Sequence, residues 1–188
     1  MRKIGIYGGT FDPIHHAHLI HARDAREMLG LEKVIFVPAA VSPFKGSPVA
    51  SAEIRLSMLQ AAIESEAGFL VEDCELRRPG PSYTIDTIEE IRRRENDAEL
   101  YCLVGEDNMS GLRSWHRFAE LEKAVRFVVL GRTGMKSDHP YSTVHRKIDI
   151  SATEIRKRVA SGQSIRYFVP QAVEDIIRRE KLYQEQVK

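Results

Sequence analysis

The 188-residue sequence lacks the features that would assign it at once to a membrane or secreted class. No apolar run reaches the roughly 18 residues of a membrane-spanning helix. The basic start, MRKIGIYGG, is not followed by the roughly 7–15 apolar residues of a secretory signal peptide. We therefore expect a cytoplasmic chain with no membrane partner.

Cysteine is also scarce, since Cys74 and Cys102 are the only two. They do not form the closely spaced pairs that bind zinc or carry out redox chemistry. In a chain expected inside the cell, two such cysteines are predicted to be reduced thiols of the core rather than a disulfide.

The sequence has no excess of charge of either sign, because 28 Lys and Arg stand against 27 Asp and Glu. General nucleic-acid binders need a large basic excess, so we expect no nucleic-acid partner. The charge is unevenly placed, since residues 51–110 hold 6 basic and 14 acidic side chains. The positive charge therefore lies toward the two ends. The ends are either solvated faces or they meet at an anionic ligand.

What is present indicates an α/β fold in one domain over residues 1–188. Short apolar runs predict strands over 3–7, 33–38, 69–71, 100–104 and 127–130. Helical patterns alternate with these strands. Two of them cover 16–29 and 51–66. Further helices are expected from Thr84, near Phe118, from the capping box at Ser151, and from Pro170 as the first helical residue. This order favours a mostly parallel, Rossmann-like sheet with helices on both faces.

Ligands of such sheets bind beyond the carboxyl ends of the strands. The first loop there, GGTFDPIHHAH, matches neither common glycine-rich phosphate motif. It still combines two glycines with a helix start, whose N–H groups attract anions. His15 and His18, three residues apart, can face the same side. Three interpretations of these two histidines are open: metal ligands, helix-start residues without a ligand, or donors to phosphoryl oxygens in a neutral or cationic state. We favour the role as donors.

The loop resembles the first motif, H-x-G-H, of a nucleotidyltransferase superfamily, and ISATEIR at 150–156 resembles its second, I-S-S-T-x-x-R. PSYTIDTIEEI at 81–91, GEDNMSGLRSWHRFAEL at 105–121 and the loop with Pro43-Phe44-Lys45 resemble the bacterial nicotinate-nucleotide adenylyltransferases. Together the motifs cover nearly the whole chain. Two positions depart from the pattern. Ala17 replaces a glycine, where its methyl would shift the adenosine slightly, and Ala152 replaces a serine.

The resemblance implies transfer of the AMP moiety of ATP to nicotinate mononucleotide, releasing pyrophosphate, in NAD biosynthesis. The mononucleotide phosphate would attack the α-phosphorus in line, without a covalent intermediate or a general base. His15, His18, Lys45 and Arg156 are the expected catalytic residues. Mg²⁺ would arrive with ATP, because the sequence has no dedicated metal site. The residues expected to bind ATP are Gly8, Gly9, Thr10, Phe11, His15, His18, Gly105, Asp107, Ser151, Thr153 and Arg156.

The mononucleotide would be bound by Lys45, Tyr83, Thr84, Trp115 and Arg132. Trp115 suits stacking on a pyridine ring. The helix start at Thr84 suits the nicotinate carboxylate. Arg132 suits the mononucleotide phosphate.

Asp12 is expected to brace its own loop through local backbone hydrogen bonds. Two other functions stay open, a phosphopantetheine adenylyltransferase and a nucleotide-binding module without turnover. The oligomeric state is also open, a homo-oligomer included.

Overall fold

The computed structural model describes residues 1–41, 47–132 and 139–184. Its strands are β1 (Arg2–Gly9), β2 (Lys33–Pro38), β3 (Phe69–Val71), β4 (Ala98–Gly105), β5 (Arg126–Gly131) and β6 (Ser142–His145). Its helices are α1 (His16–Leu29), α2 (Ala52–Ile63), α3 (Cys74–Arg77), α4 (Thr84–Arg94), η1 (Glu106–Ser114, a 3₁₀ helix), α5 (Phe118–Ala124), α6 (Ala152–Ala160) and α7 (Gln171–Arg179).

The six strands form one sheet in the order β3-β2-β1-β4-β5-β6, and every neighbouring pair is parallel. The chain first builds outward from β1 through β2 to β3, then returns to add β4 on the other side of β1. The strand order therefore reverses between β1 and β4, which is where open α/β sheets bind ligands. The expected Rossmann-like fold is confirmed.

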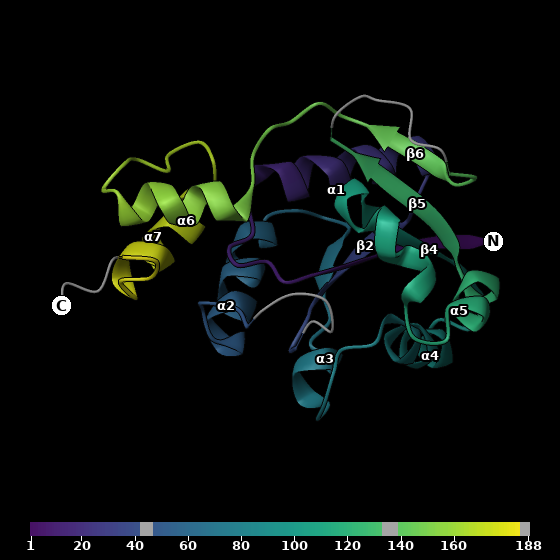
Figure 1. The fold of residues 1–188 in the computed structure, drawn as a ribbon. Helices are drawn as coiled ribbons and strands as arrows, with labels where there is room; N and C mark the ends of the chain where they lie inside the picture. The colour runs from purple at the N-terminus through teal and green to yellow at the C-terminus, as the bar shows by residue number, and fades with distance from the viewer. Residues whose placement is uncertain (42–46, 133–138, 185–188) are drawn as a thin grey trace.

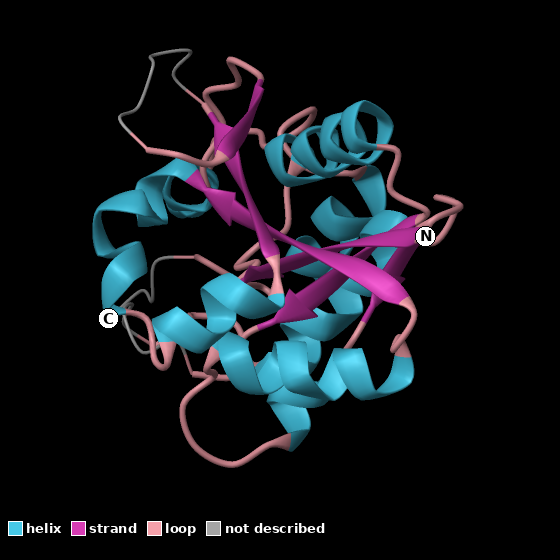
Figure 2. Cartoon of the chain, turned by 90° about the vertical axis from the view of Figure 1, so that its right-hand side faces the viewer, coloured by secondary structure: helices cyan, strands magenta, loops and turns pink. Residues whose placement is uncertain are grey.

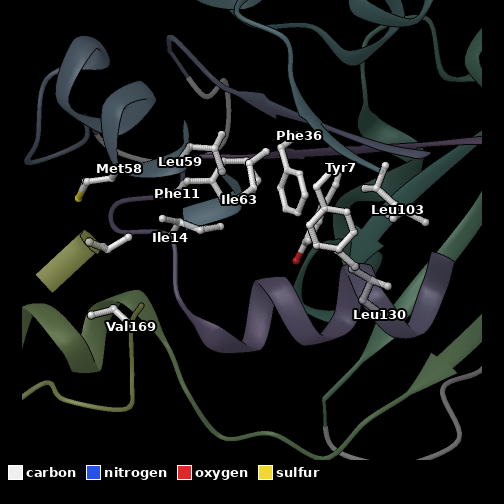
Figure 3. Close-up of a cluster of buried hydrophobic side chains, with 14 of the residues drawn as sticks. Tyr7, Phe11, Ile14, Phe36, Met58, Leu59, Ile63, Leu103, Leu130 and Val169 are labelled. Carbon is white, nitrogen blue, oxygen red and sulfur yellow. The ribbon is translucent and has the colours of Figure 1, made fainter. Parts of the chain in front are cut away.

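Side chains alternate across the strands and fill two apolar layers. One layer joins the sheet to α1, α2, α6 and α7, and its central side chains are labelled in Figure 3. The other joins the sheet to α3, α4 and α5. Figure 1 shows α2, α6 and α7 grouped away from α4 and α5, and Figure 2 shows helices covering the sheet on both sides. Both faces are buried, as a parallel sheet requires.

Most expected elements are present, with corrections at their ends. Helix α1 has the expected bounds and ends at Gly30, whose φ of 63° is a left-handed conformation that favours glycine. Pro170 is the N-cap of α7 rather than its first helical residue. Helix α2 is shorter than 51–66. The sequence patterns did not predict β6, α3 or η1.

Cys74 and Cys102 are free and buried, as expected. Burial raises the pKa of the Cys74 thiol to about 11 and that of Cys102 to about 12. Both are therefore protonated core residues. Among the described residues, no helix has the length and apolar character to cross a membrane.

Candidate active site

Two pockets adjoin at the carboxyl ends of β1 and β4, where the strand order reverses. The first, here the histidine pocket, encloses about 450 Å³. The second, here the aromatic pocket, encloses about 130 Å³. The residues lining both are Gly8, Gly9, Thr10, Gly105 and Asn108. A ligand of two connected parts could therefore occupy both pockets across this shared wall.

The histidine pocket gathers residues from both ends of the chain. His15 and His18 lie at the start of α1, and their rings stack with centroids 3.6 Å apart. The backbone N–H of His15 donates to Nδ1 of His18 at 3.3 Å. A neutral His18 ring that accepts at Nδ1 carries its hydrogen on Nε2, so it can donate from that atom.

His15 is almost fully buried, with 1% of its surface exposed. Burial, and after it the positive charge of Arg132, lowers the pKa of His15 to about 3. The ring is therefore neutral near pH 7. Of the two charge states that the sequence left open, the structure favours the neutral one for His15.

Two arginines supply the positive charge of this pocket. Arg156, on α6, donates from one guanidinium nitrogen to the carbonyl of Asp12 at 2.7 Å and from the other to the Thr153 hydroxyl at 3.3 Å. Arg132 follows β5 and interacts with the hydroxyl of Tyr7. Both line the histidine pocket. Arg132 is thus grouped with the histidines, apart from the other residues expected to bind the mononucleotide.

Helix α6 opens toward the same pocket. The Ser151 hydroxyl accepts from the N–H of Glu154 at 3.1 Å, which confirms it as the N-cap. Ser151, Ala152 and Thr153 all line the pocket, so the positive end of the helix dipole faces it. An anion bound here would meet this helix end, Arg156 and the histidines together.

The carboxylate of Asp12 connects three distant segments beneath the pocket. It accepts from the N–H groups of Val49 at 2.8 Å and Ala50 at 3.2 Å, and from the hydroxyl of Tyr183 at 2.7 Å. The expectation of local backbone bonds was therefore wrong, since these partners lie 37, 38 and 171 residues away. Asp12 ties the first loop to the start of α2 and to the C-terminal segment.

A second buried charge holds the glycine loop. Arg55 of α2 is 1% exposed and donates to the carbonyl of Thr10 at 2.8 Å. The negative charge of Asp12 favours the charged guanidinium against the cost of burial. Neither Arg55 nor Tyr183 was expected from the sequence. An arginine on an amphipathic helix usually faces solvent, so no local signal identified it.

Glycines keep the shared wall open. A Cβ at Gly8 would have no atom within 4 Å, so its side-chain space lies open at the edge of both pockets. A Cβ at Gly105 would come within 2.5 Å of Oδ1 of Asp107, so glycine there lets that carboxylate lie against the backbone. These are the close approaches that a bound ligand needs.

The aromatic pocket contains the other expected mononucleotide residues. Tyr83, the N-cap of α4, stacks on His116 with centroids 4.3 Å apart. Thr84 begins α4, and Trp115 follows η1; both line the pocket. A flat apolar ring fits between such side chains, and a carboxylate fits the helix start. Glu75 also lines this pocket and was not expected from the sequence.

The structure brings together most of the residues predicted for the site. Lys45 lies outside the described residues. Ala17 is fully buried and is absent from the described lining of both pockets, so its methyl does not reach the expected ligand space. The expected residues that line the histidine pocket are Gly8, Gly9, Thr10, Phe11, His15, His18, Gly105, Asp107, Arg132, Ser151, Thr153 and Arg156.

One cluster elsewhere has oxygen and sulfur atoms close enough to hold a metal ion, formed by Glu72, Cys74 and Glu90. Arg94 pairs with one oxygen of Glu72 at 2.6 Å, and Arg77 pairs with the other at 3.1 Å. These cations already neutralise the carboxylate, and the Cys74 thiol is protonated. The charged groups of this cluster therefore form an ion-pair network.

Sequence comparison relates the chain to a family of nucleotidyltransferases. The family model described as cytidylyltransferase-like matches residues 6–158. A probable nicotinate-nucleotide adenylyltransferase of Thermomicrobium roseum is 40% identical, over 97% of this chain and 92% of that protein. A relative of the same description from Methylacidiphilum infernorum is 42% identical, over 96% and 92%.

Comparison with solved structures finds the same fold. The Plasmodium falciparum nicotinic acid mononucleotide adenylyltransferase complexed with NaAD superposes with a TM-score of 0.84 over the full length of both chains. The sequence identity is 21%, so this likeness concerns the fold alone.

Proposed function

The chain belongs to the nicotinate-nucleotide adenylyltransferases of the cytidylyltransferase-like family, and we propose that it transfers the AMP moiety of ATP to nicotinate mononucleotide. The products are nicotinate adenine dinucleotide and pyrophosphate, a step of NAD biosynthesis. The observation that carries the proposal is the pair of adjoining pockets, one basic and one aromatic, on opposite sides of a glycine-lined wall. Residues 1–188 would act as one adenylyltransferase domain.

In this proposal ATP occupies the histidine pocket and the mononucleotide occupies the aromatic pocket. The mononucleotide phosphate reaches into the histidine pocket past Gly8 and Gly105. There it attacks the α-phosphorus of ATP in line. One P–O bond forms and the bond to pyrophosphate breaks. The attacking phosphate is already anionic near neutral pH, so the step needs no general base. The protein contributes positioning and charge stabilisation.

The neutral His15 ring and the His18 ring would donate hydrogen bonds to the α- and β-phosphates. Arg156 and the start of α6, with Ser151 and Thr153, would hold the β- and γ-phosphates. Pyrophosphate gains charge as it leaves, so donors fixed around it stabilise the transition state more than the ground state. The arginine bonds to Asp12 and Thr153 support this role, because they fix the guanidinium before ATP binds.

Arg132 keeps the role expected from the sequence, contact with the mononucleotide phosphate, but it would act from the histidine pocket. Its place beside Tyr7 and His15 supports contact with a phosphate at the border of the two pockets. That phosphate can be the attacking one, which must approach the histidines to reach ATP. Trp115, Tyr83 and the start of α4 at Thr84 would hold the pyridine ring and its carboxylate.

Mg²⁺ is proposed to arrive with ATP. The carboxylates among the described lining residues of the histidine pocket are Asp12 and Asp107. Asp12 already accepts from three donors, so a hydrated Mg²⁺ would be held mainly by the substrate phosphates. When bound, the ion neutralises charge on the phosphoryl oxygens.

The test measures pyrophosphate release from ATP and Mg²⁺ with three acceptors in parallel: nicotinate mononucleotide, its amide and phosphopantetheine. We expect fastest release with the nicotinate acceptor. Release with phosphopantetheine alone would assign the chain to the rival adenylyltransferase. ATP binding without release for any acceptor would instead assign a nucleotide-binding module and overturn the proposal.

A further inference from the structure

Glu75 is a buried carboxyl group in the aromatic pocket, and the mechanism above does not use it. It lies on α3 and is 7% exposed. It lines the same pocket as Tyr83, Thr84 and Trp115. A carboxylate is an unexpected neighbour for a pocket proposed to receive an anionic pyridine, because two like charges oppose each other in a low dielectric.

The contacts of Glu75 connect it to both sides of the α4 start. The Thr87 hydroxyl donates to Oε1 of Glu75 at 2.7 Å. The Ser82 side chain forms a second hydrogen bond with the same carboxyl group. Ser82 in turn accepts from the N–H of Ala40 at 3.0 Å, in the loop after β2. Since Ser82 and Thr87 flank Tyr83 and Thr84, Glu75 holds the backbone that would meet the pyridine carboxylate.

The charges around Glu75 come from several elements. Burial raises the pKa of Glu75 above its ordinary value, the two hydroxyl groups and Arg78 oppose that shift, and Asp86 adds to it. Cys74 and Cys102 also face it, and both thiols are neutral. Tyr83 and His116 line the same pocket, and their rings stack on each other.

We propose that Glu75 is the positioning residue that sets acid-over-amide selectivity, because it holds the start of α4 and lies in the pocket that would receive the pyridine carboxylate. This inference rests on the proposed function. A protonated Glu75 keeps its hydroxyl contacts and brings no charge, so the helix start can receive the nicotinate carboxylate. An ionised Glu75 opposes that carboxylate but not the neutral amide.

The experiment measures kcat/KM for nicotinate mononucleotide and for its amide from pH 6 to pH 9. The ratio of the two values cancels the ionisation of the shared phosphate, of ATP and of any protein group that affects both acceptors equally. We expect the wild-type ratio to fall as pH rises. An interaction of one pKa unit between the two carboxylates corresponds to about a tenfold fall. In Glu75→Gln the ratio should stay high and nearly constant, because glutamine keeps the acceptor for Thr87 and cannot ionise.

Three further variants separate Glu75 from its surroundings. His116→Gln replaces the imidazole that stacks on Tyr83 in the same pocket, and the fall of the ratio should persist in it and vanish in the double variant with Glu75→Gln. Glu89→Gln makes the same change on α4 outside both pockets, where Glu89 pairs with Arg117, and should behave as wild type. Thr87→Val removes the donor to Glu75 and should raise KM for nicotinate mononucleotide several-fold with KM for ATP unchanged.

A wild-type ratio that does not vary with pH would overturn the inference, and so would an equal slope in wild type and Glu75→Gln. Should Glu75→Gln fail to fold by circular dichroism, Thr87→Val decides, and equal changes in both KM values would refute the positioning role. Release with neither mononucleotide would refute the proposed function, whereas release with an unchanged slope refutes only the role of Glu75.

Discussion

The hydroxyl of Tyr183 offers the sharpest test of how the phosphate-facing loop is held. It donates to Oδ1 of Asp12 at 2.7 Å, and the tyrosine is 8% exposed. Burial and the neighbouring Asp12 carboxylate both raise the pKa of Tyr183, so the hydroxyl stays protonated and can donate near neutral pH. Tyr183→Phe removes this donor and leaves the ring in place.

The expected cost follows from the partners that remain. A hydrogen bond to a charged group contributes about 1.5–3 kcal/mol. Val49 and Ala50 still donate to Asp12 in the variant, so the carboxylate is not left unpaired. We therefore expect a loss of about 2 kcal/mol in the free energy of unfolding, within that range. At about 2–4 °C per kcal/mol for a chain of this size, Tm should fall by about 4–8 °C.

Urea unfolding followed by circular dichroism measures this loss, with an unchanged slope m as the sign that the unfolded state is the same. Tyr167→Phe is the matched control, since Tyr167 is 78% exposed and should change stability by less than about 0.5 kcal/mol. Because the Asp12 carbonyl accepts from Arg156, KM for ATP should rise in Tyr183→Phe alone. Stability of Tyr183→Phe equal to that of the control would refute the argument.

Three further outcomes are expected. His18→Ala should lower kcat far more than it weakens ATP binding, because the contact of His18 with phosphate strengthens as charge moves onto pyrophosphate. Steady-state kinetics and an equilibrium ATP titration measure the two effects. An unchanged kcat would exclude a catalytic role for His18. Trp115→Ala should raise KM for the mononucleotide and leave KM for ATP nearly unchanged, whereas equal effects would make Trp115 structural. His15 has a pKa of about 3 when folded and about 6.5 when unfolded, so the folded state loses stability as pH falls between these values. NMR should show no titration of His15 from pH 8 to pH 5, and a midpoint near 6.5 would contradict its burial.

The sequence predicted those helices and strands whose apolar pattern and end residues lie within the element itself. Helix α1 combines an apolar face with a terminal glycine, and Gly30 adopts the left-handed conformation that this ending needs. Strand β6 has no such signal, because Ser142–His145 contributes a single buried residue, Val144, at the edge of the sheet. Its strand character comes from pairing with β5.

The residues of the site likewise fall into a group that the sequence predicted and a group that it did not. The motifs around His15, Ser151 and Thr84 identified side chains and helix starts that face the two pockets. The residues that support them escaped detection because their partners are far away in the chain. Arg55 is buried against the carbonyl of Thr10, and Tyr183 donates to Asp12 across 171 residues. Such contacts follow from the packing of α2 and the C-terminal segment onto the first loop. Neither the apolar pattern nor the charge distribution of the sequence predicts that packing.

The fold brings together in one pocket charged residues that lie far apart in the sequence. Arg132 and Arg156 come from the basic second half of the chain and meet the histidines of the first loop in one pocket. The positive charge of Arg132 helps to keep His15 neutral. In the proposed site, the arginines would carry the permanent charge that attracts a polyanion, and the His15 ring would stay neutral. The contact of His15 with the phosphates would then not depend on a ring that is half protonated near pH 7.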